Sequence, residues 1–130
     1  MEIALQPPAL FGLASRHAQW ASVRQTAIAG NIANANTPGY KAVDTEPFSA
    51  VLEKTGASMA RTSAGHIEVP SATSSSTRTR AKGVDGDETV GGNTVSIEQE
   101  MLKADEVQRA FSLNTGIVRS FHRMILASVK

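Results

Sequence analysis

Two long stretches with a helical repeat lie at opposite ends of the chain, at residues 8–36 and 96–129. In both, apolar side chains recur at steps of three and four residues, the pattern of an amphipathic α-helix. The first helix would span about 43 Å and would be marginal without a partner. We therefore predict a mainly α fold in which two long terminal helices pair as a coiled-coil-like hairpin.

The C-terminal stretch carries more apolar surface than one partner helix can cover. Its main stripe steps at about 3.5 residues, the coiled-coil repeat, and a second stripe flanks it. A helix that is apolar on several sides is buried on several sides, so we expect other subunits to cover part of it. The side chains predicted to pack in the helix pair or between subunits are Leu10, Leu13, Trp20, Ile28, Ile32, Ile97, Met101, Phe111, Val118, Phe121, Ile125 and Val129.

The start of the second helix carries a capping signal. Ser96 is the expected N-cap residue, and Gln99, three positions later, fits a capping box by reaching back to it. Glu98 and Glu100 in the first turn suit the positive end of the helix dipole. We therefore predict that the helix begins directly after Ser96.

The segment between the helices, residues 41–92, is poor in apolar side chains. Low hydrophobicity of this kind predicts an extended, partly disordered segment that becomes ordered on binding its neighbours. Within it we expect a short helix at Pro47–Lys54, ended by Gly56, and short strands at His66–Val69 and Glu88–Val90.

The chain therefore divides into a helix and turn (1–40), this middle segment (41–92) and a second helix (93–130), with both helices in one assembly domain. Its 13 Lys and Arg residues nearly balance 12 acidic ones, so the net charge of +1 does not indicate nucleic-acid binding. The absence of cysteine excludes a thiolate metal site. His17 and His122 lie on the helix stripes and fit interface histidines better than ligands.

No catalytic constellation is recognisable, and we predict no enzyme activity, no cofactor, no metal and no small-molecule substrate. No segment approaches the roughly 20 apolar residues of a membrane helix. The N-terminus has neither a basic region nor a sufficient apolar run for a Sec signal peptide. If the protein works outside the cytoplasm, we therefore expect another route to move it there.

The end of the first helix carries a dense turn signal. Proline disfavours helical geometry in the residue before it, and glycine after it can adopt positive φ. The asparagines can bond local backbone and hold a chain that turns back across the helix end. The residues of this signature turn are Asn31, Asn34, Asn36, Thr37, Pro38, Gly39 and Tyr40. Composition alone would favour the interpretation that the run is only a turn.

The same run, Asn31–Ala42, resembles the N-terminal signature of bacterial flagellar axial proteins. A second run, Gly92–Met101, resembles the segment that opens the C-terminal helix of flagellar rod proteins. The middle stretch around Arg61–Ile67 and the helix at Gln108–Leu113 are similar to the FlgB family of proximal rod proteins. The chain also lacks the large inserted domain of a hook protein or a flagellin.

This resemblance implies a structural subunit of the flagellar basal-body rod, which transmits torque and surrounds the export channel. The implied partners are other rod proteins, copies of the chain itself, a basal-body adaptor at the rod base and the flagellar type III export apparatus. The implied location is the periplasmic rod, reached without a cleaved signal peptide. Two alternatives remain at this point: an intracellular coiled-coil adaptor with a disordered loop, and a small enzyme.

Overall fold

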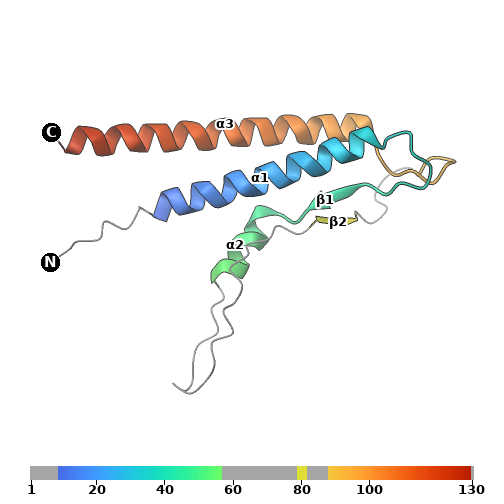
Figure 1. The fold of residues 1–130 in the computed structure, drawn as a ribbon, viewed down its shortest axis with the longest axis horizontal. Helices are drawn as coiled ribbons and strands as arrows, with labels where there is room; N and C mark the ends of the chain where they lie inside the picture. Colours follow the sequence, from blue (N-terminus) through green and yellow to red (C-terminus); the bar gives the residue numbers. More distant parts are fainter. Residues whose placement is uncertain (1–8, 57–78, 82–87, 130) are drawn as a thin grey trace, which may run out of the picture.

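The computed structural model describes residues 9–56, 79–81 and 88–129. Its elements in chain order are α1 (Ala9–Ala33), β1 (Val43–Thr45), α2 (Phe48–Gly56), β2 (Thr79–Ala81) and α3 (Ile97–Ser128). The two long helices run antiparallel and pack together along their length (Figure 1). The predicted mainly α fold with a terminal helix pair is therefore confirmed.

The molecule has a closed end and an open end. At the closed end, the turn after α1 and the segment before α3 lie side by side (Figure 1). At the open end, the start of α1 and the end of α3 lie near each other. Helix α1 is the middle layer, because α3 covers one side of it while β1, β2 and α2 lie on the other.

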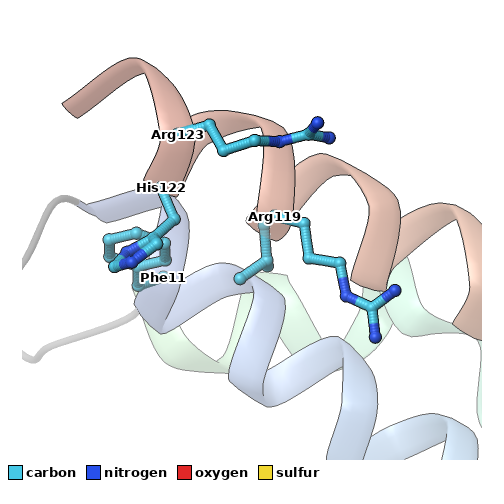
Figure 2. A pocket seen from close by; sticks show the side chains of 5 residues that line it. Phe11, Arg119, His122 and Arg123 are labelled. Carbon is cyan, nitrogen blue, oxygen red and sulfur yellow. The ribbon is translucent and has the colours of Figure 1, made fainter. Parts of the chain in front are cut away.

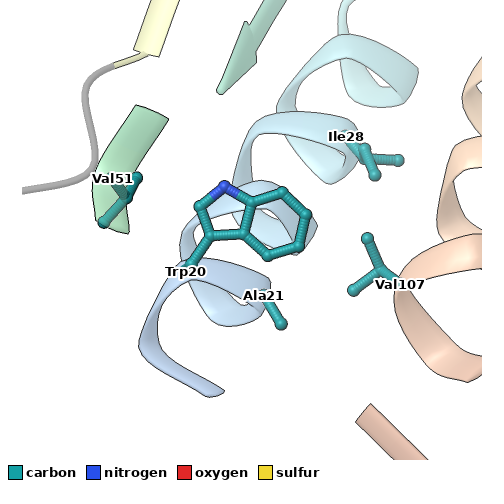
Figure 3. Packing of buried hydrophobic residues seen from close by; sticks show 5 residues of the cluster. All are labelled: Trp20, Ala21, Ile28, Val51 and Val107. Carbon is teal, nitrogen blue, oxygen red and sulfur yellow. The ribbon is translucent and has the colours of Figure 1, made fainter. Parts of the chain in front are cut away.

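The core is small and lies where three helices meet. Trp20 packs between Val51 of α2 and the α1–α3 contact formed by Ile28 and Val107 (Figure 3). The indole Nε1 donates a hydrogen bond to the carbonyl oxygen of Glu46, 2.8 Å away, so the one polar atom of this ring is satisfied. This hydrogen bond holds the segment between β1 and α2 against α1.

Two short strands form an antiparallel pair, with Val43 opposite Ala81 and Thr45 opposite Thr79. The strand predicted at Glu88–Val90 is wrong, because these residues form a loop and a turn. Thr89 bonds locally: its N–H donates to the carbonyl of Asn93 at 3.0 Å, which closes a turn rather than a ladder. The strand predicted at 66–69 lies outside the described residues.

The helix predicted at 47–54 is present as α2. The first long helix ends at Ala33 and not at residue 36. Asn34 explains the early end, since its side-chain Nδ2 donates to the Gly30 carbonyl at 2.9 Å and its backbone carbonyl takes part in the turn at Thr37.

Candidate functional site

The two signature runs of the sequence meet at the closed end of the hairpin. Two hydrogen bonds join their backbones: Gly39 N donates to Gly91 O at 2.8 Å, and Thr94 N to Tyr40 O at 3.1 Å. A third runs from the backbone N–H of Ala42 to the Thr94 hydroxyl at 2.9 Å. We call this region the junction, formed by residues 31–44 and 88–103. It brings together segments that lie more than fifty positions apart in the chain.

Asn31 is at the centre of the junction and has no exposed surface. Its amide pairs with the backbone of Val43 in both directions, donating to the carbonyl at 2.7 Å and accepting from the N–H at 3.0 Å. The same Nδ2 donates to Glu100 of α3 at 3.0 Å, and Oδ1 accepts from the Tyr40 hydroxyl at 3.4 Å. One side chain therefore ties α1, the returning strand and α3 together.

Asn93, in the second signature run, binds the backbone of the first run. Its Nδ2 lies 2.8–3.0 Å from the carbonyl oxygens of Asn34, Ala35 and Thr37, in the turn that follows α1. Its Oδ1 accepts from Val95 N at 2.8 Å and so holds the approach to α3. Only 4% of Asn93 is exposed, so this cap is sheltered from water.

Two glycines allow the runs to approach closely. Gly39 and Gly92 have φ of 73° and 75°, in the left-handed region that favours glycine. A Cβ on Gly92 would lie 3.6 Å from the Gly39 Cα and 3.4 Å from a Glu88 oxygen. Around them, the Thr37 hydroxyl donates to Asn34 Oδ1 at 3.2 Å. The remaining turn residues, Asn36 and Pro38, are exposed.

A chain of charges runs behind the junction. Glu100 is 2% exposed and accepts from Lys103 Nζ at 2.7 Å. Lys103 also lies 3.3 Å from Asp44, whose other oxygen lies 3.4 Å from Arg24 Nε. Burial lowers the pKa of Lys103, but its hydrogen bond to Glu100 and the negative charges of Asp44 and Glu100 outweigh this effect, so the pKa of Lys103 lies above the ordinary 10.5. Lys103 and Asn31 each donate a hydrogen bond to one oxygen of Glu100, and the positive charge of Lys103 compensates the negative charge of this buried carboxylate.

Helix α3 begins directly after Ser96, the N-cap residue, whose Oγ accepts from Gln99 N at 3.5 Å. The Ser96 hydroxyl donates to the Glu98 carboxylate at 3.0 Å, so Glu98 rather than Gln99 supplies the side-chain contact to the cap. The hydrogen bond from its own backbone N–H and then the one from Ser96 lower the pKa of Glu98.

Sequence reasoning named the turn but did not single out Asn93, Glu100 or Asp44 as site residues. Two features of the sequence pointed to Asn93 and Glu100. Asn93 and Glu100 stand inside the second signature run, and Glu100 lies three positions from Ile97 on a helix otherwise predicted to pack by apolar contacts. A carboxylate at such a position requires a buried partner, which in the folded chain is Asn31 with Lys103.

The side chains predicted to pack fall into two groups. Trp20 and Ile28 are buried, and Leu10, Val118, Phe121 and Ile125 are half-buried in the helix pair. At the open end, the rings of Phe11 and Phe121 meet edge to face, 5.6 Å apart. The second group is exposed in the single chain: Leu13, Ile32, Ile97, Met101, Phe111 and Val129.

An open hollow of about 560 Å³ lies at this end, lined by Phe11, Val118, Arg119, His122 and Arg123. Arg119 and Arg123 extend away from Phe11 along α3 (Figure 2). Neither forms an ion pair with another residue of the described ranges. No nucleophile stands in this lining, so it offers a surface for contact rather than chemistry.

Within the described ranges, no cluster of three or more His, Asp or Glu side chains could hold a metal ion. In that same part of the chain, every helix is too short or too polar to cross a bilayer. His17 stacks in an aromatic group, with its ring 4.9 Å from that of Phe48 and 5.5 Å from that of Trp20. The site of interest is therefore the junction together with the exposed apolar faces.

Comparison with known proteins also points to the turn after α1. A family model described as "Flagella basal body rod protein" matches residues 18–41, which include the turn and most of α1. The flagellar basal body rod protein FlgB of Agrobacterium fabrum is 45% identical over 136 aligned residues, which cover 100% of this chain and 99% of that protein.

Proposed function

Because this chain belongs to the FlgB family of flagellar basal body rod proteins and is a component of that rod, we propose that it is a structural subunit of the proximal rod. In this role it assembles helically with other rod proteins and with copies of itself. The assembly forms the drive shaft that transmits torque and surrounds the export channel. The role is structural rather than catalytic.

The observation that carries this proposal is the surplus apolar surface of a hairpin that is otherwise complete. The buried side chains of Asn31 and Asn93 in the junction are satisfied by hydrogen bonds inside the chain. By contrast, eight large apolar side chains of α3 and Val129, the residue directly after it, are exposed: Ile97, Met101, Leu102, Phe111, Leu113, Ile117, Met124, Leu126 and Val129. Exposed apolar surface of this extent is typical of a subunit that is buried in an assembly.

The finer features of the proposal extend the family assignment. Both terminal helices would form the inner coiled-coil layer of the rod, with the adaptor at the rod base and the other rod proteins as neighbours. The chain would reach its periplasmic position through the flagellar type III export apparatus. The full-length similarity to a rod protein favours this role over the alternative of an intracellular coiled-coil adaptor with a disordered loop.

The experiment that tests the proposal is electron microscopy of basal bodies from a strain that lacks this chain. We expect membrane rings without a rod, and restoration of the rod by the intact chain. Complementation with Asn31→Ala, which breaks the junction, should fail. Complementation with Asn36→Ala, an exposed position in the same turn, should succeed. Complete rods in the deletion strain would contradict the proposed role.

A further inference from the structure

A hollow with three walls lies beside the start of α1. Its volume is about 240 Å³, and its walls include Leu10 and Leu13 of α1, Phe48 of α2, and Leu113 and Ile117 of α3. Three of these apolar side chains are 41–66% exposed: Leu13, Ile117 and Leu113. The described part of the chain therefore leaves this apolar hollow open.

Two other open hollows lie at the same end of the helix pair, with volumes of about 560 and 440 Å³. Arg119 lines both of them, and no residue of α2 lines either. The three-walled hollow has no Asp, Glu, Lys or Arg in its lining. Of the three, it is therefore the one that best suits a short apolar segment of chain.

The residues that precede α1, residues 1–8, lie outside the described residues, but their sequence has a clear pattern. Apolar side chains stand at every second position, at Met1, Ile3 and Leu5. In an extended backbone, alternate side chains point to the same side, so these three would form one apolar edge. Pro7 and Pro8 follow, and proline favours extended backbone in the residue before it.

This segment is long enough to reach the hollow. Leu10, which lines the hollow, is the second residue of α1, so the chain enters α1 directly beside it. Four extended residues allow Leu5 to lie up to about 13 Å from Ala9, whereas Leu13 is only about 6 Å from Ala9 along the helix axis. A segment that turns back along α1 can therefore place Ile3 and Leu5 over the hollow.

We propose that residues 1–6 fold back along α1 and place Ile3 and Leu5 in the three-walled hollow. In the free chain, the docked segment covers part of the exposed apolar surface, including Leu113. It therefore competes with any partner that binds this side of the helix pair. The contact lies within one chain and goes beyond the proposed rod role, which is tested separately.

Introduced cysteines can report this contact, because the chain contains no cysteine of its own. The test variant carries Leu5→Cys and Leu113→Cys in the full chain. The matched control carries Leu5→Cys and Phe111→Cys, because Phe111 lines the 440 Å³ hollow on the other side of the α1–α3 contact and lies only about 3 Å from Leu113 along the axis. Leu113 and Phe111 are 66% and 47% exposed, so both introduced thiols are accessible.

Oxidised glutathione is added to dilute protein, and mass spectrometry of the monomer measures how fast the internal disulfide forms. The tether alone gives the two pairs similar rates, because both partner positions lie at similar distances from residue 5. We expect the Leu5→Cys/Leu113→Cys chain to close at least about tenfold faster than the control. Adding Ile3→Asp to the test variant should remove this advantage, whereas adding Gln6→Asp should leave it unchanged.

Similar closure rates for the two cysteine pairs would overturn the inference, and so would faster closure of the control pair. An advantage that persists with Ile3→Asp would also overturn it, because the apolar contact would then not hold the segment. None of these results bears on the rod role, which depends on whether the deletion strain lacks rods.

Discussion

Replacing Asn31 by alanine is the sharpest test of how the two signature runs hold the hairpin closed. The side chain is fully buried and makes four hydrogen bonds, to both backbone groups of Val43, to Glu100 and to Tyr40. Asn34, in the same turn, provides the matched control. Asn34 is half-buried, and its side chain bonds only within its own helix end, to Gly30 and Thr37.

The magnitude follows from the groups left without partners. Asn31→Ala orphans the N–H and the carbonyl of Val43 and one oxygen of Glu100, and a buried unsatisfied group costs about 1–3 kcal/mol. Val43 is half-buried, so water can reach part of it, and Glu100 keeps its bond with Lys103. We therefore expect a loss of about 3–4 kcal/mol in the free energy of unfolding, against about 1 kcal/mol for Asn34→Ala.

Equilibrium unfolding in urea measures both losses. Trp20 is the single tryptophan and is 8% exposed in the core, so its fluorescence reports opening of the helix pair. Far-UV circular dichroism reports the helices independently, and coincident transitions would justify a two-state treatment. Equal losses for Asn31→Ala and Asn34→Ala, or a loss under about 1 kcal/mol for Asn31→Ala, would refute the reasoning.

Three further predictions concern the same region. Gly92→Ala should cost about 1 kcal/mol in unfolding free energy because of its positive φ, whereas Gly91→Ala should be nearly neutral; equal effects in urea unfolding would contradict this. Ser96→Ala should cost about 1 kcal/mol by removing the helix cap, and an unchanged urea midpoint would contradict that role. Burial lowers the pKa of Lys103, but its acidic partners, Glu100 among them, raise it further, so the net pKa lies above 10.5. Its stabilisation should therefore be complete below about pH 10 and disappear as the pH rises through the folded-state pKa. Lys103→Met should remove this alkaline loss, and identical pH profiles for both chains would exclude it.

The helices could be predicted because their signals are local. The cap at Ser96 and the apolar repeat lie within one or two turns of the residues that they organise, and α3 begins at the predicted position. The strand pair could not be predicted from such signals. Residues 43–45 and 79–81 are three residues each and lie far apart in the chain, so no short window contains both.

In the candidate site, too, local features were predictable from the sequence and long-range contacts were not. The turn after α1 was predictable from Pro38 and Gly39, which restrict or permit backbone angles wherever they stand. The pairing of Asn31 with Glu100 was not predictable, because the two residues lie 69 positions apart and no local pattern links them. Only the folded chain shows that the two runs complete each other.

The contrast between the polar junction and the exposed apolar side chains of α3 has a consequence for how the chain is stabilised. Among the described residues, four of the eight buried apolar side chains are alanines, and the large ones are Trp20, Ile28, Val51 and Val107. Such a core contributes little burial for the part of the chain that the structure describes, while more than ten large apolar side chains remain exposed there. A partner that binds only the folded form adds its binding free energy to stability. The junction therefore sets the shape of the hairpin by directional polar contacts, and in the proposed assembly further apolar stabilisation comes from covering the exposed side chains of α3.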